Sequence, residues 1–212
     1  MQVVVNSYDV STPWGAVFVT TFSVTEAALV RTYAVPYKAQ GAFRGKLGNL
    51  QKQGLFGAKN MPGRGKALQY GSDQFHRLIF ACELFEFGVG PAPVLALVEL
   101  LWESRLSQIF KKAEGAVERH RDPGPNDIVM HMGGVRLMTD TWSNAVPNVN
   151  YCTLQKLNDH MQVWMRMGVD DRLPSRALVV NLSSRLRQFH AAFSGLHMQH
   201  MPEKKDKKRS KK

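Results

Sequence analysis

Acidic residues are missing from one long stretch of this chain. Ala27 to Ser72 contains eight Lys or Arg and no Asp or Glu. The last ten residues, Glu203 to Lys212, hold seven basic residues against two acidic ones. Residues 73–202 are balanced, with thirteen of each sign, so the net charge of +11 arises from one internal stretch and one tail. Positive charge concentrated in this way predicts a polyanionic partner, and we expect nucleic acid.

Cysteine is also scarce. The chain has only Cys82 and Cys152, which form no CxxC pair and show no Cys/His spacing of the kind that holds zinc. A disulfide framework and a structural zinc site are therefore not expected. We predict a reducing compartment.

An early positive charge and long apolar runs are absent as well. The first basic residue is Arg31, so the positively charged start of a secretory signal is missing. The most apolar run, Pro93 to Trp102, is too short to cross a bilayer and contains Glu99. We expect a cytoplasmic, nucleoid-associated protein without membrane contact.

The sequence has little that indicates enzyme chemistry. No segment has the GxxxxGK[ST] spacing that cradles nucleotide phosphates. His197 and His200 have the i, i+3 spacing of helical ligands, but they border the basic tail and no cysteine accompanies them. Cys152 has no adjacent histidine or acid to activate it as a nucleophile. The methionines and tryptophans beyond position 129 suit an apolar core or a dimer face better than a ligand pocket. We predict no catalytic residue, no cofactor and no metal.

The first half of the chain predicts a β extension followed by helices. The β-branched and aromatic runs Val3–Val5 and Ala16–Phe22 predict two short strands. Ser23 and Glu26 have the spacing of a capping box, which predicts a short helix that ends near Thr32. Further helices are predicted from Pro36 to a stop at Gly54, from a cap at Ser72 to Gly88, and from Pro91 to about Val117.

A small α+β unit is predicted in the second half. Arg121–Asn126, with the sequence RDPGPN, is the clearest linker. Ile128–Met132 and Val135–Thr139, joined by Gly133-Gly134, predict a hairpin because two glycines permit the positive φ angles of a tight turn. The remaining predictions are a helix over 154–167, a strand over 177–182, and a last helix that is capped by Ser183 or Ser184 and ends near Gly195.

The acid-free stretch has the order helix, tight turn, helix, basic loop, helix, which is typical of a winged helix-turn-helix. There the second helix enters the major groove and the loop lies along phosphates as a wing. Gly63 and Gly65 let the loop backbone approach phosphate closely. The predicted DNA-contacting residues are Tyr37, Lys38, Gln40, Arg44 and Lys46 on the second helix and Lys59, Asn60, Arg64 and Lys66 on the loop. The C-terminal tail is expected to add non-specific phosphate affinity.

The segment from Phe22 to about Val98 resembles the MerR-type winged helix-turn-helix domain. FSVTEAA corresponds to the opening helix, LQKQGLF to the end of the recognition helix, and the segment from PGRGKALQY onward to the wing and the helices after it. The matching positions are Gly54, Leu55, Arg64, Tyr70, Asp73, Leu78 and Gly88. The resemblance implies a DNA-binding winged domain and, together with the half-site logic of such proteins, a homodimer.

Gly41, Gly45 and Gly48 depart from the expected recognition helix, because each glycine costs a helix about 1 kcal/mol relative to alanine. Their spacing predicts either a smooth face for close helix packing or a helix that becomes firm only on DNA.

Together these patterns predict an α+β fold. The predicted parts are an N-terminal β extension (1–22), a MerR-like winged helix-turn-helix domain (23–120), a small α+β domain for dimerisation or effector sensing (126–196) and a basic disordered tail (197–212). The predicted function is a sequence-specific transcriptional regulator that binds double-stranded DNA, with RNA polymerase or another protein as a partner of the C-terminal domain. The alternative is a packaging, partition or architectural factor of phage or plasmid type that docks on DNA and on a protein partner. An RNA-associated protein is the weakest reading, because the sheet aromatics of RNA-recognition motifs are missing.

Overall fold

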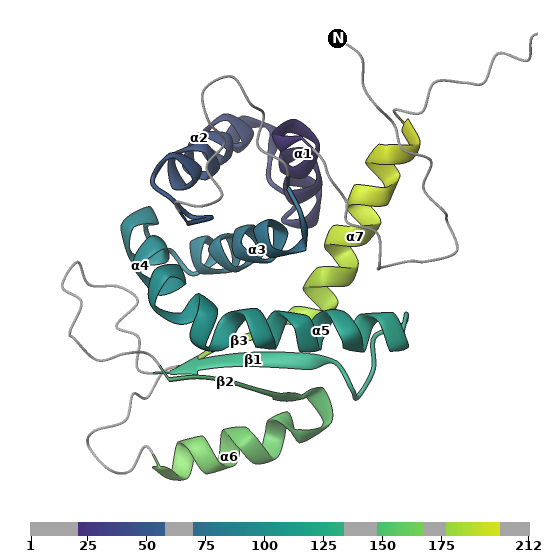
Figure 1. Ribbon diagram of the computed structural model, residues 1–212. Coiled ribbons are helices and arrows are strands. Elements are labelled where there is room, and N and C mark those ends of the chain that lie inside the picture. Colours follow the sequence, from purple (N-terminus) through teal and green to yellow (C-terminus); the bar gives the residue numbers. More distant parts are fainter. Residues whose placement is uncertain (1–20, 58–69, 134–147, 168–176, 200–212) are drawn as a thin grey trace, which may run out of the picture.

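The computed structural model describes residues 21–57, 70–133, 148–167 and 177–199 (Figure 1). It has the predicted α+β fold, with helices packed around a three-stranded antiparallel sheet. The first predicted strand and most of the second lie outside the described residues. Within these residues, no helix is both long and apolar enough to cross a membrane.

The first helix, α1 (Phe22–Thr32), begins two residues earlier than the predicted cap at Ser23 implies. Thr21 is its extended N-cap, so Phe22 is helical and does not end a strand. The predicted capping box is therefore wrong. Ser23 lies inside the helix, and the Glu26 carboxylate pairs with Arg44 instead of reaching back to the helix start.

The next two helices follow the predicted boundaries closely, except that Gly71 and not the predicted Ser72 is the N-cap of the second one. A 3₁₀ turn, Tyr37–Ala39, leads into α2 (Gln40–Lys52), and α3 spans Ser72–Glu86. Gly54 after α2 and Gly88 after α3 have φ angles of +97° and +77°. Glycine adopts this left-handed conformation without a Cβ penalty, which explains why both helices end there.

The long predicted helix after Pro91 forms as one path with an irregular middle. It consists of α4 (Pro91–Leu101), a π-helical segment (Trp102–Leu106) and α5 (Ser107–Arg119). Trp102 is almost fully buried, and its Nε1 donates a hydrogen bond to Asp73 Oδ1 at 2.8 Å. Since Asp73 lies in the first turn of α3, this bond ties the π segment to the start of that helix.

The sheet corrects the predicted hairpin. Its central strand, β1 (Ile128–Gly133), pairs antiparallel with β2 (Asn148–Thr153) on one side and β3 (Ala177–Asn181) on the other. Val135–Thr139, the predicted partner, lies outside the described residues, and both edges of β1 are occupied by other strands. All six residues of β1 are buried, and α5 and α6 lie on opposite faces of the sheet (Figure 1).

The C-terminal half ends with two helices. A 3₁₀ turn (Leu154–Lys156) precedes α6 (Leu157–Met167), and α7 spans Leu182–Gln199. The predicted cap of α7 is wrong, because the Asn181 Oδ1 accepts the Ser184 N–H at 2.9 Å. The Ser183 hydroxyl is engaged elsewhere: it accepts the Ile128 N–H at 2.9 Å.

Helix α7 returns to the N-terminal helices and packs along α1 and α5 (Figure 1). One hydrophobic cluster of buried residues accordingly includes Leu29 of α1, Leu78 of α3, Phe110 of α5, Met130 of β1 and Phe189 of α7. The core therefore extends across the predicted linker. The division into domains at 23–120 and 126–196 stays a prediction.

Candidate nucleic-acid interface

The turn between α1 and α2 is short and tightly hydrogen-bonded. Ala34 has a φ of +46°, the only positive φ of a non-glycine residue in the described chain. Its N–H bonds to the Arg31 carbonyl at 3.2 Å, and the Val35 N–H bonds to the Val30 carbonyl at 3.0 Å. This pair of bonds is the Schellman motif, and it reverses the chain within the length of a helix-turn-helix connection.

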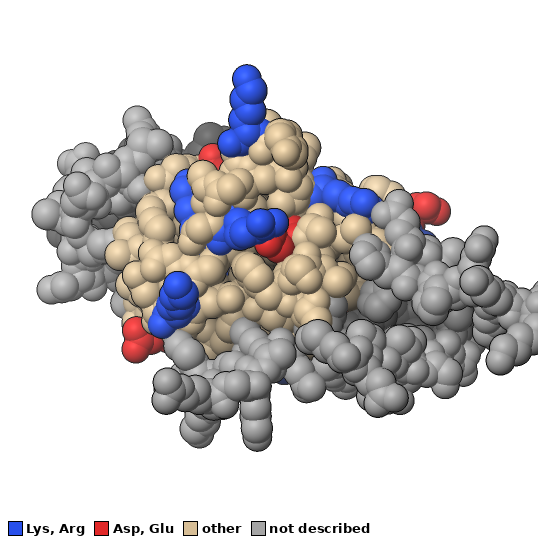
Figure 2. Space-filling view, turned by 90° about the horizontal axis from the view of Figure 1, so that it is seen from above, with Lys and Arg blue, Asp and Glu red and all other residues tan. Residues whose placement is uncertain are grey.

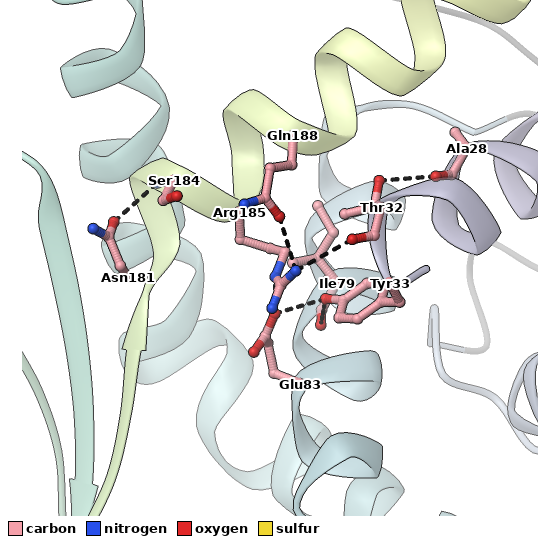
Figure 3. Close-up of polar contacts among 9 residues, drawn as sticks. All are labelled: Ala28, Thr32, Tyr33, Ile79, Glu83, Asn181, Ser184, Arg185 and Gln188. Atoms are coloured by element: carbon pink, nitrogen blue, oxygen red, sulfur yellow. Dashed lines mark hydrogen bonds and ion pairs between the residues drawn. The ribbon is translucent and has the colours of Figure 1, made fainter. Parts of the chain in front are cut away.

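A buried polar cluster holds this turn in place (Figure 3). Glu83 of α3 is 4% exposed and accepts a hydrogen bond from the Tyr33 hydroxyl at 2.8 Å. Arg185 of α7 forms an ion pair with Glu83, and its guanidinium lies 4.5 Å from the Tyr33 ring centroid. Arg185 also donates to the Thr32 carbonyl at 3.3 Å, so α7 directly supports the end of α1. Burial, above all, raises the pKa of Tyr33 well above its usual value, so its hydroxyl keeps its proton.

Helix α2 has one apolar face and one open face. Leu47 and Leu50 are fully buried, and Phe43 packs against the core from the same side. Because successive residues of an α-helix are about 100° apart, Gly41, Gly45 and Lys52 fall on the opposite side. The open face of α2 therefore presents glycine backbone in its middle and Lys52 at its end.

The three glycines are not in close packing contact with any other described residue. A Cβ added at Gly41, Gly45 or Gly48 would meet no atom within 4 Å. The smooth-face explanation therefore finds no partner helix among the described residues of this chain. Within these residues, the glycine face of α2 (Gly41, Gly45 and Gly48) is open.

The predicted cationic contacts of α2 divide into two kinds. Lys38 is exposed and, among the described residues, takes part in no ion pair. Arg44 directs its Nε to Glu26 at 2.8 Å; the Arg44 side chain is 67% exposed and the Glu26 side chain 7%. Lys46 lies over the Phe85 ring of α3, with its Nζ 5.4 Å from the ring centroid. Lys38 is thus available for a phosphate, whereas Arg44 and Lys46 lean toward the flanks of the helix.

The other predicted contacts fare differently. Tyr37 is 89% exposed at the start of the second helical segment, where a partner can reach it. The Gln40 Nε2 donates to the Val35 carbonyl at 3.3 Å, so this side chain braces the turn. The four wing residues, Lys59, Asn60, Arg64 and Lys66, lie outside the described residues, and their role stays a prediction. Lys52 was not among the predicted contacts, although its spacing of seven and eleven residues from Gly45 and Gly41 places it on the open face.

Negative charge beside this motif is neutralised internally. Among the described residues, Glu26 and Glu83 beside this motif are buried and form ion pairs with Arg44 and Arg185. On the face seen from above, where α1 and α2 lie in Figure 1, blue Lys and Arg side chains outnumber the small red areas of Asp and Glu (Figure 2). The described part of this face is therefore attractive to a polyanion.

Comparison with protein-family models, with curated proteins and with solved structures finds no match to this chain. The resemblance to the MerR-type domain therefore stays a prediction, and the helix-turn-helix interpretation depends on the geometry of α1, its turn and α2.

Proposed function

We propose that this protein is a transcriptional regulator that binds double-stranded DNA through α1, the turn and α2. The observation that carries the proposal is a tight, braced turn followed by two exposed cations, Lys38 in the 3₁₀ turn before α2 and Lys52 on the open face of α2. Phosphate contacts supply most of the affinity in such interfaces and fix the orientation of the protein on the duplex. The neighbouring acids are buried in ion pairs, so they do not repel the phosphates.

The glycine face of α2 favours a second candidate, an architectural or packaging factor. Base readout requires side chains that reach the base edges. Gly41, Gly45 and Gly48 offer backbone instead, which permits close approach to a sugar-phosphate surface of any sequence.

A binding assay on a library of genomic fragments separates these two functions. The full-length protein is mixed with the library at about 0.15 M salt, and bound fragments are recovered by gel shift. A regulator enriches fragments that share one sequence, whereas an architectural factor binds all fragments with similar affinity. Preference for an RNA duplex or single strand over duplex DNA, or no binding at this salt concentration, would contradict both.

A further inference from the structure

The face of the sheet that α6 covers gathers three possible metal ligands from separate elements. In the β1–β2 register His131 lies opposite Asn150, and Val129 lies opposite Cys152. Residues two apart on a strand share a face, so His131 and Cys152 are diagonal neighbours on one side of the sheet. Met130 and Met132 point to the other side, where they belong to the main hydrophobic core.

His160 of α6 completes the group. Its ring centroid lies 5.7 Å from that of His131. One ligand atom from each of His131, Cys152 and His160 lies within 4.8 Å of the other two. His131 is 2% exposed and Cys152 is 5% exposed, while His160 is exposed on the helix. The group is therefore anchored on the rigid sheet and accessible from one side.

We propose that His131, Cys152 and His160 bind a Zn²⁺ ion. Two imidazole nitrogens and one thiolate are a donor set that zinc accepts, and three protein ligands leave a fourth tetrahedral position for water. Zinc–nitrogen and zinc–sulfur bonds of about 2.0–2.3 Å place tetrahedral ligand atoms roughly 3.5 Å apart. The ligand atoms, which lie within 4.8 Å of one another, need to move closer by at most about 1.3 Å, and the exposed side chain of His160 can turn to achieve this.

Zinc would also supply an anchor that α6 otherwise lacks in the described chain. The side chains of α6 are described for residues 157–163. None of these is buried, and Val163 is 54% exposed. A bond from His160 through the metal to β1 and β2 would fix α6 on the sheet. Metal binding would then reduce the mobility of α6, and a measurement of that mobility does not depend on the DNA-binding proposal.

The test uses the full-length protein, freed of metal with a chelator and titrated with Zn²⁺ in a calorimeter. We expect one tight site per chain. Co²⁺ in place of Zn²⁺ should give a thiolate-to-metal charge-transfer band, because Cys152 is a ligand. Hydrogen exchange of the α6 amides, residues 157–167, should slow when Zn²⁺ is added.

Variants separate this site from adventitious binding. His160→Ala and Cys152→Ser should each weaken Zn²⁺ binding by at least about 100-fold, since loss of even an outer-shell partner costs 10–100-fold. His160 is exposed, so its replacement leaves the fold intact, which circular dichroism can verify. His120→Ala, at an exposed histidine on another part of the surface, is the matched control and should bind as the parent does. Absence of a tight site, or a tight site that survives both ligand replacements, would overturn the proposal.

Discussion

At the scale of single residues, the turn between α1 and α2 contains a conformational cost. Ala34 occupies the left-handed region with a φ of +46°. The equivalent positions after α2 and α3 are Gly54 and Gly88, which adopt that region freely. An alanine there keeps the turn short but makes it less stable than it could be.

Replacement of Ala34 by glycine should therefore stabilise the protein. The left-handed conformation costs a residue with a Cβ about 1–2 kcal/mol, partly offset by the greater freedom of glycine in the unfolded chain. We expect Ala34→Gly to raise the free energy of unfolding by about 0.5–1 kcal/mol in a urea titration. Ala42→Gly is the control, because Ala42 lies inside α2, where glycine costs a helix about 1 kcal/mol relative to alanine. Equal effects of the two replacements would contradict the strain at Ala34.

The Arg44–Glu26 pair has a structural role besides any contact with DNA. Arg44→Ala leaves the carboxylate of Glu26, which is 5% exposed, without its partner. We expect a loss of about 1–2 kcal/mol in the free energy of unfolding, because a buried charge then lacks its hydrogen bonds. Adding Glu26→Gln to Arg44→Ala should recover part of that loss. A double-mutant cycle measures the coupling, and strictly additive effects would show that the pair contributes nothing.

At the scale of elements, the helices and the strands β1 and β3 were largely predictable, whereas β2 and the pairing of the strands were not. Glycine stops after α2 and α3 and the proline start of α4 are local signals, and the structure confirms them. The pairing of β1 depends on strands about 20 and 50 residues further along the chain, which no local turn signal reveals.

The candidate sites, like the pairing of the strands, depend in part on contacts between segments that are far apart in the sequence. The basic face of α2 was visible as charge and spacing in one segment. The flanking positions of Arg44 and Lys46 depend on Glu26 and Phe85, which belong to other helices. The group of His131, Cys152 and His160 has no ligand spacing in the sequence, because the register of β1 and β2 and the path of α6 bring it together.

The glycine face of α2 yields a prediction with opposite signs for folding and binding. Gly45→Ala should raise stability by up to about 1 kcal/mol, since alanine is the better helix former and its Cβ meets open space. If this face approaches the duplex closely, the same methyl group should weaken DNA binding. Gly115→Ala in α5 is the control, expected to raise stability without changing DNA affinity. Unchanged DNA affinity of Gly45→Ala would show that the glycine face is not in contact with DNA.

At the scale of the whole molecule, α7 packs on the core and brings the half-buried His190 close to the buried His76 of α3. Burial, above all, lowers the pKa of His76 to about 4 and that of His190 to about 3. The His76 ring stacks on Phe110 with centroids 4.9 Å apart. Because His76 is neutral over most of the pH range, its 3.9 Å contact with Glu114 does not act as an ion pair.

Acid should therefore destabilise the protein through these histidines. A histidine in the unfolded chain has a pKa near 6.5. At any pH between that value and the lower pKa of the folded protein, each of these histidines takes up a proton when the chain unfolds. With respect to these groups, the free energy of unfolding should be constant above about pH 6.5. Below that pH it should fall by up to roughly 1.4 kcal/mol for each pH unit and for each of the two histidines. Burial raises the pKa of Glu114, which opposes this fall in part. Urea titrations from pH 7 to about pH 5 measure the slope, and His190→Gln should reduce it. A flat profile in this range would mean that the histidines are not buried as described.

The most direct test of the central claim, that Lys38 before α2 and Lys52 on its open face contact the DNA backbone, is the salt dependence of duplex binding. We compare the parent with the pair Lys38→Ala/Lys52→Ala, and with the matched pair Lys111→Ala/Lys156→Ala, which removes the same charge from exposed positions elsewhere. Each lost phosphate contact lowers the slope of log K against log salt by about 0.9, so Lys38→Ala/Lys52→Ala should lower it by about 2. The control pair should leave the slope close to that of the parent. Equal slopes for the two double variants would contradict the claim.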